Sequence, residues 1–161
     1  MRVNKSTVYA VLAVAHIARH AESDLLQGRL IAEAYGIPNE YLLKILQLLV
    51  RNGILTSETG RRGGFSLSRP PAEISLLQIM EAVDGPMIGE VPTLERMTEG
   101  ADVAARLKEL LESLFASGRK MLADYRLDTL IQQSSAPSAM PIKFLGERRT
   151  SKDDEPKVPT I

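Results

Sequence analysis

Apolar residues recur at helical spacing in several stretches of the first half of the chain. The pattern predicts a helix from Asn4, as N-cap, to about Ala21, and then a short helix over about 27–35 that Gly36 would end. Ile37 and Pro38 open a further helix over about 39–52, with Gly53 just beyond its end. Two helices joined by a short turn that contains glycine are typical of a helix-turn-helix.

Two short runs with the composition of strands follow, at 54–58 and 65–68. The segment 59–64 between them supplies the glycines of a hairpin tip, so the two strands are expected to form a wing. Ser75 and Gln78 have the spacing of a capping box, which predicts a helix from there to about Val83. The expected fold is mainly α-helical with a small β-hairpin, a winged helix-turn-helix.

The longest helical run covers about 101–125, and its apolar residues alternate spacings of four and three. This spacing favours a seam against a second helix, and we interpret the run as a dimerisation helix. A core helix that packs only within its own chain is the alternative. The seam residues expected at the dimer interface are Leu107, Leu111, Leu114, Met121 and Tyr125.

The chain of 161 residues therefore divides into three predicted parts. Residues 1–86 form a winged helix-turn-helix DNA-binding domain, and residues 87–133 hold an irregular connection and the dimerisation helix. Residues 134–161 are rich in Ser, Pro and charged residues without any period, which predicts a disordered tail.

Composition narrows the classes of function. Lys plus Arg total 20 and Asp plus Glu total 20, so the positive charge that a polyanion requires must be local. The absence of cysteine excludes disulfides, cysteine nucleophiles and thiolate metal sites. No run approaches the roughly 20 apolar residues of a membrane span, so we expect a cytoplasmic protein without a membrane partner. The sequence contains no phosphate loop, His-Glu-x-x-His or nucleophile elbow, and an enzyme is not expected.

The predicted helix over 39–52 carries Glu40, Lys44, Gln47 and Arg51 on one stripe, while most of its other side chains are apolar. This suits insertion into a DNA major groove, where the first residues of the helix would face the bases. The alternative is a solvated stripe stabilised by an ion pair between Glu40 and Lys44. The residues expected at the groove are Asn39, Glu40, Tyr41 and Lys44.

The expected hairpin tip carries Arg61 and Arg62, which can reach a minor groove or phosphates. Gly63 and Gly64 beside them would allow a close approach of the backbone to DNA. Solvated charges at a loop tip are the alternative interpretation, and the position directly after a helix-turn-helix favours the DNA interpretation.

An ordered set of motifs runs through the chain: Met1-Arg2-Val3, Tyr9-Ala10, Ile31-Ala32-Glu33, Gly36-Ile37, Tyr41-Leu42, Leu49, Gly53-Ile54-Leu55, Gly60, Gly63-Gly64-Phe65, Leu67, Arg69-Pro70, Ile74-Ser75-Leu76 and Ala82-Val83-Asp84-Gly85. Through this set the chain resembles the Rrf-two family of bacterial winged-helix regulators, in particular its iron–sulfur cluster and cysteine-metabolism groups. The resemblance covers residues 1–86 closely, and the long helix fits the family's dimerisation helix.

The resemblance implies a homodimer whose long helices cross and which presents two recognition helices to a palindromic operator in double-stranded DNA. It also implies that Arg2 and Lys5 meet phosphate and that the wing enters the minor groove. The wing departs from the family pattern, because Thr59 stands where an Arg is usual. Leu43 occupies a position on the recognition helix that is polar in some relatives, so the operator sequence does not carry over.

Cluster-binding relatives place three cysteines before the long helix, and this chain has none, so no cofactor is expected. Carboxylates at Glu90, Glu95, Glu99 and Asp102 are more often solvated than bound to a cation. His16 and His20 could share a metal, but they have no third ligand nearby in sequence, and no metal is expected. The chain is thus similar to relatives that respond to a small effector or a partner protein.

These observations predict a sequence-specific DNA-binding transcriptional regulator, a repressor that acts as a homodimer. The alternative is a winged-helix module that has lost DNA binding and docks a protein through the same stripe. A positive patch on one dimer face would favour DNA. The patch would join Arg2, Lys5, Lys44, Arg51, Arg61 and Arg62.

Overall fold

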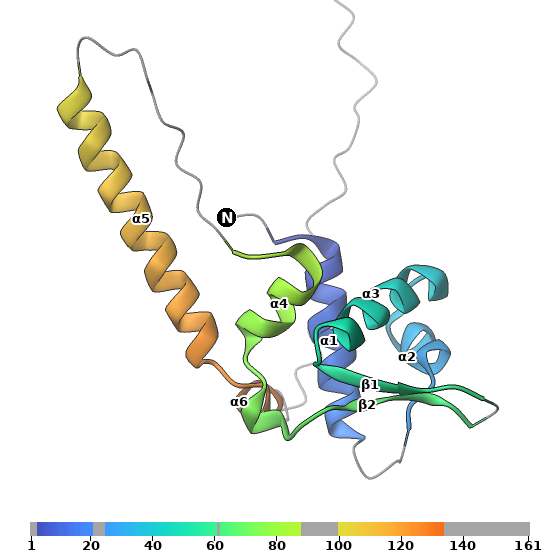
Figure 1. The fold of residues 1–161 in the computed structure, drawn as a ribbon. Coiled ribbons are helices and arrows are strands. Elements are labelled where there is room, and N and C mark those ends of the chain that lie inside the picture. The colour runs from blue at the N-terminus through green and yellow to red at the C-terminus, as the bar shows by residue number, and fades with distance from the viewer. Residues whose placement is uncertain (1–2, 21–24, 61, 88–99, 134–161) are drawn as a thin grey trace, which may run out of the picture.

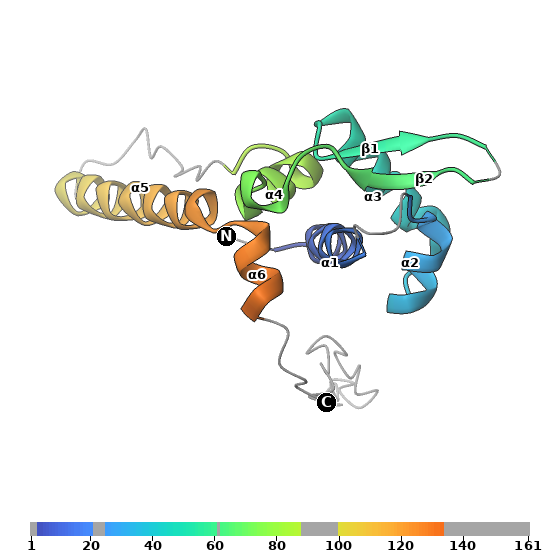
Figure 2. The same cartoon turned by 90° about the horizontal axis from the view of Figure 1, so that it is seen from below.

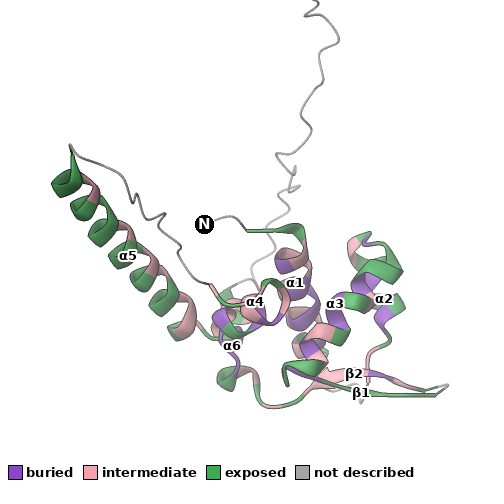
Figure 3. Ribbon diagram, turned by 45° about the horizontal axis from the view of Figure 1, so that its top comes forward, coloured by how far each residue is buried: buried purple, intermediate pink, exposed green. Residues whose placement is uncertain are grey.

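Four helices enclose the core, and their order is the one that the apolar pattern predicts. The computed structural model describes residues 3–20, 25–60, 62–87 and 100–133. Within it, α1 (Lys5–Arg19), α2 (Gly28–Tyr35), α3 (Asn39–Arg51) and α4 (Leu76–Asp84) pack together (Figure 1). Figure 3 shows that the buried faces of these helices turn toward one another. The core contains fully buried side chains from α1, α3 and α4, for example Val14, Leu46 and Ile79.

The helix ends confirm the glycine and capping signals of the sequence. Gly36 follows α2 with φ 62° and Gly53 follows α3 with φ 68°, a left-handed conformation that side chains other than glycine rarely adopt. At the start of α4, the Gln78 amide donates to the Ser75 hydroxyl, and the Gln78 side chain accepts from the Ser75 amide. Asn4 is the N-cap residue of α1, but its side chain makes no capping hydrogen bond.

The wing is an antiparallel pair of β1 (Leu55–Glu58) and β2 (Gly64–Leu67), each one residue from its predicted start. Figures 1 and 2 show the hairpin projecting beyond the helices. Leu26, just before α2, pairs with Phe65 on the open edge of β2 through hydrogen bonds of 3.0 and 2.8 Å. This bridge fixes the tip-side half of the paired strands to the segment just before α2. The short helix η1 (Pro71–Glu73) then leads to α4.

Helix α5 (Ala101–Asp124) extends away from the core and contains no buried residue (Figure 3). The chain then turns into a second helix, α6 (Leu127–Gln133), which the sequence did not predict. The Leu76 amide donates to the Tyr125 carbonyl, and the Leu127 amide donates to the Ile74 carbonyl, each at 2.9 Å. These bonds hold Tyr125 and Arg126 in an extended turn between the two helices, so Tyr125 caps α5 one residue beyond its last helical residue. Among the described residues, no helix is long and apolar enough to cross a membrane.

Candidate nucleic-acid interface

Helix α3 exposes the polar stripe that the sequence predicts. Glu40, Lys44, Gln47 and Arg51 are all exposed, whereas Leu42, Ile45, Leu46 and Leu49 are buried. In the first turn, Asn39 is exposed and Tyr41 is 41% exposed. The helix therefore anchors itself through one face and presents polar side chains and one phenol on the other.

The first turns of α1 and α3 lie side by side. The rings of Tyr9 and Tyr41 meet edge to face, with centroids 6.0 Å apart and planes at 83°. Lys5 lies one turn before Tyr9 on the same face of α1 and is exposed. The contact thus brings the predicted phosphate-binding end of α1 toward the predicted base-reading end of α3. Tyr9 was not among the predicted site residues, although it stands in one of the motifs of the resemblance.

The ion pairs recorded within the described ranges leave the predicted cations free. The pairs are Arg29 with Glu33 at 3.7 Å, Lys108 with Glu112 at 3.8 Å, and Arg119 with Glu81. None of them includes Lys5, Lys44, Arg51 or Arg62. In particular, Glu40 and Lys44 form no ion pair, so the solvated-stripe interpretation lacks the contact that would stabilise it.

The wing contributes Arg62, which is exposed just beyond the tip. Arg61 and Arg2, also predicted to meet DNA, lie outside the described residues. The tip turns through a hydrogen bond of 3.0 Å from the Gly63 amide to the Gly60 carbonyl.

The packing of the hairpin requires glycine at positions 63 and 64, for a reason that the sequence did not reveal. A Cβ on Gly63 would overlap the Glu58 carbonyl, and a Cβ on Gly64 would lie 2.7 Å from the Leu26 carbonyl oxygen. The hairpin itself therefore requires both glycines. Their predicted close approach to DNA stays a prediction.

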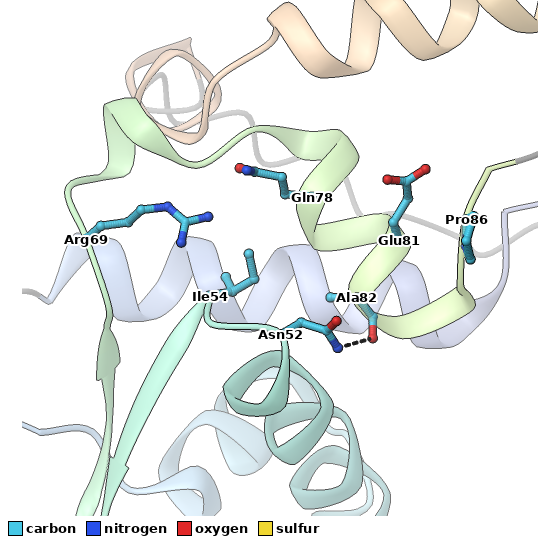
Figure 4. A pocket seen from close by; sticks show the side chains of 7 residues that line it. All are labelled: Asn52, Ile54, Arg69, Gln78, Glu81, Ala82 and Pro86. Atoms are coloured by element: carbon cyan, nitrogen blue, oxygen red, sulfur yellow. Dashed lines mark hydrogen bonds between the residues drawn. The ribbon is translucent and has the colours of Figure 1, made fainter.

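The far end of α3 is fixed by two residues that sequence reasoning missed. The Asn52 side-chain amide donates to the carbonyls of Leu48 and Ala82, at 2.9 and 3.2 Å, and so joins α3 to α4 (Figure 4). The Arg69 guanidinium donates from Nη1 to the Gly53 carbonyl at 2.7 Å. Asn52 thus fixes α3 against α4, and Arg69 holds the junction between α3 and the wing.

A third anchor joins α4 to the start of α1. The Asp84 carboxylate accepts hydrogen bonds from Asn4 Nδ2 at 3.2 Å, from the Ser6 hydroxyl at 3.1 Å, and from the buried Thr7 hydroxyl. Asp84 thus supplies the negative charge that a helix N-terminus favours, in place of the capping that Asn4 was expected to provide.

The histidine pair of α1 packs on the helix-turn-helix. The rings of His16 and His20 stack with centroids 4.3 Å apart, and His16 Nδ1 lies 3.3 Å from the Tyr35 hydroxyl of α2. Burial, followed by the charges of His20 and Arg19, lowers the pKa of His16 below its ordinary value. Within the described residues, no group of three His, Cys, Asp or Glu side chains could hold a metal ion.

The predicted dimerisation seam lies along α5. Leu107, Leu114 and Met121 are exposed, and Leu111 is half-buried. Val103 and Leu110 add two exposed apolar side chains. Tyr125 is half-buried beyond the helix, and its hydroxyl donates to Gln133 Oε1 of α6. The helical spacing of the seam therefore ends at Met121.

Helices α2 and α3 with the hairpin after them define a winged helix-turn-helix, a class of nucleic-acid-binding folds. Residues 3–133 match the sequence model of the Rrf2 (Rrf-two) family, described as an iron-dependent transcriptional regulator. The chain belongs to the Rrf2 family of transcriptional regulators. Members of this family are regulators and not enzymes, as the sequence predicts.

Relatives and solved structures agree with this assignment. Rv1287 of Mycobacterium tuberculosis, named for the HTH-type transcriptional regulators, is 31% identical over 71% of this chain and 75% of its own. Protein aau3 of Rhizobium meliloti is 31% identical over 82% and 86%. The fold resembles CymR, the global cysteine regulator of B. subtilis, with a TM-score of 0.70, 22% identity and coverage of 83% and 98%. It also resembles T. potens IscR, with a TM-score of 0.60, 21% identity and coverage of 87% and 93%.

The iron of the family description does not fit the donor set of this chain. The whole sequence contains no cysteine, and the described residues bring together no three candidate ligands of other types. The carboxylates Glu90, Glu95 and Glu99 lie outside the described residues.

Proposed function

We propose that this protein is a sequence-specific DNA-binding repressor that acts in the cytoplasm as a homodimer on a palindromic operator. The observation that carries the proposal is the exposed stripe of α3. Within the described residues its Lys44 and Arg51 form no ion pair, and its Tyr41 meets Tyr9 near the start of α1. A helix held by its apolar face, with polar side chains free on the other, has the form of a recognition helix.

The side chains divide by role. Asn39, Glu40, Tyr41 and Lys44 stand at the start of α3, where recognition helices contact base edges, and amide, carboxylate and ammonium groups can each discriminate bases. Three exposed cations, Lys5 at the start of α1, Arg51 at the last turn of α3 and Arg62 on the wing, are suited to phosphate or minor-groove contacts. Arg2, Arg61, Gly63 and Gly64 complete the proposed interface.

The homodimer is inferred from α5. This 24-residue helix contains no buried residue and exposes five large apolar side chains, so packing within its own protomer stabilises it little. A second copy would cover the exposed side chains. Two copies related by a two-fold axis would present their α3 helices to the two halves of a palindrome. Occupation of such an operator in a promoter would repress transcription, and a small effector or a partner protein would supply the signal.

The test measures DNA affinity as a function of salt concentration for variants that each remove one positive charge. Lys44→Ala and Arg62→Ala should weaken binding, and a lost phosphate contact should reduce the slope of log affinity against log salt by about one. Lys120→Ala removes an exposed charge from α5 and should leave affinity and slope unchanged. If all three variants bind DNA as the wild type does, the proposed interface is wrong. If the folded wild type binds no DNA, the protein-interaction module becomes the better account.

A further inference from the structure

A pocket of about 330 Å³ lies where α3, the start of β1 and α4 meet (Figure 4). It is at the other end of α3 from the proposed base-reading turn. Its apolar lining comes from Ile54 and Ala82, which are buried, and from Pro86. The volume is at the lower end of the range of small-molecule sites, about 300–1,000 Å³.

Two hydrogen-bond donors lie at one side of this pocket, and both are already held in place. Arg69 donates from Nη1 to the Gly53 carbonyl and from Nε to the Glu73 carbonyl, at 2.7 and 3.4 Å. Gln78 uses its Oε1 to accept from Ser75 at 3.0 Å. In the part of the chain that the structure describes, neither Arg69 Nη2 nor Gln78 Nε2 has a hydrogen-bond partner. Figure 4 shows the two side chains on the same side of the pocket.

On the opposite side of the pocket, the polar groups of Glu81 and Asn52 already have partners. The Glu81 carboxylate pairs with Arg119 of α5 and accepts from the Met87 amide at 2.9 Å. The Asn52 amide nitrogen donates both of its protons to backbone carbonyls. Because Arg119 neutralises Glu81, the charge of Arg69 remains uncompensated in the lining, and the pocket favours an anion.

We propose that this pocket binds a small organic carboxylate. The carboxylate would accept from Arg69 Nη2 and Gln78 Nε2, in a charge-assisted arrangement that suits a guanidinium. The carbon body would cover Ile54, Ala82 and Pro86. Since the donors are fixed before the ligand arrives, little ordering opposes binding. The binding needs no DNA, so the proposal is independent of the function proposed above.

The experiment is a titration of the isotope-labelled full chain, without DNA, followed through backbone amide resonances. Butyrate supplies a carboxylate and a short apolar body, n-butylamine keeps the body with the opposite charge, and inorganic phosphate keeps an anion without the body. Butyrate should cause saturable shifts at Asn52, Gln78 and Ala82. It should bind at least about tenfold more tightly than n-butylamine, because only the carboxylate accepts the charge-assisted bonds, and more tightly than phosphate.

A matched pair of variants tests the assigned donor. Gln78→Glu keeps the capping-box acceptor and places a negative charge where the carboxylate would lie, so butyrate binding should be lost while the amide spectrum stays that of a folded protein. Gln132→Glu adds the same charge at an exposed position of α6 and should bind butyrate as the wild type does. The proposal is overturned if butyrate causes no saturable shifts, if phosphate or n-butylamine binds as tightly, or if Gln78→Glu still binds.

Discussion

Replacing Leu107 and Leu114 of α5 with Glu tests the proposed dimer without touching the core. The two side chains are 54% and 64% exposed, lie seven residues apart on one face, and belong to a helix without a buried residue. Leu and Glu have similar helix propensities, so the double substitution should leave the helix and the fold of the single chain unchanged. Its effect should be confined to association.

The magnitude is set by the exposed area that a partner would cover. Complete burial of a leucine side chain contributes about 1.5–3 kcal/mol, and somewhat over half of each side chain is still available for burial. Each leucine thus contributes about 1–2 kcal/mol to association, and the four in a dimer contribute about 4–8 kcal/mol. At about 1.4 kcal/mol per factor of ten, the dissociation constant should rise at least about a thousandfold.

Sedimentation equilibrium at micromolar concentration measures this change directly. The wild type should sediment as a dimer and the double variant as a monomer with an unchanged circular-dichroism spectrum. Ala105→Glu with Ala116→Glu is the control, because it adds two charges on the opposite, exposed face of α5 and should remain dimeric. A monomeric wild type, or a double variant that stays dimeric, would refute the reasoning.

Three further predictions concern the single chain. Asp84→Asn should lower the free energy of unfolding, measured by urea titration, by about 1–2 kcal/mol, because three hydrogen-bond donors lose a charged acceptor. The control Glu73→Gln, on exposed η1, should change it by less than about 0.5 kcal/mol. Gly64→Ala should cost about 1–3 kcal/mol and speed hydrogen exchange of the Phe65 amide, since the new Cβ would press on the Leu26 backbone. Burial lowers the pKa of His16 in the folded chain, so as the pH falls the imidazole is protonated in the unfolded chain before it is protonated in the folded one. Stability should be complete above pH 6.5 and fall as the pH drops below it, and thermal scans of His16→Gln should show a shallower fall than the wild type.

The elements that the sequence predicted are those with local signals. Gly36 and Gly53 ended their helices because left-handed backbone strongly favours glycine, and Ser75 with Gln78 began α4 through bonds between residues three apart. The end of α5 lies within one residue of its predicted position, but the turn after it and helix α6 were not predicted, because no glycine or proline marks the turn. There the Tyr125 carbonyl bonds to Leu76 and the Leu127 amide bonds to Ile74, some fifty residues earlier, and such a pairing leaves no trace in local periodicity.

The candidate site shows the same division. The stripe from Glu40 to Arg51 was visible as helical periodicity, and its exposure is confirmed. The contacts that fix the end of α3 were not visible, because Asn52 and Arg69 bond to Ala82 and Gly53, which lie far from them in sequence. The sequence singled out the glycines of the wing for a close approach to DNA, whereas the close neighbours that the structure reveals are Glu58 and Leu26 of the same chain.

Selection of DNA fragments tests the central claim most directly. Purified wild type and Glu40→Ala would each be incubated with sheared genomic DNA, and the bound fragments would be sequenced. The wild type should enrich a recurrent sequence with two-fold symmetry, and Glu40→Ala should change the preferred base at one position in each half-site, with a cost of about 1–3 kcal/mol there. Enrichment of no recurrent sequence by the folded wild type, or an identical preference for both proteins, would contradict base reading by the first turn of α3.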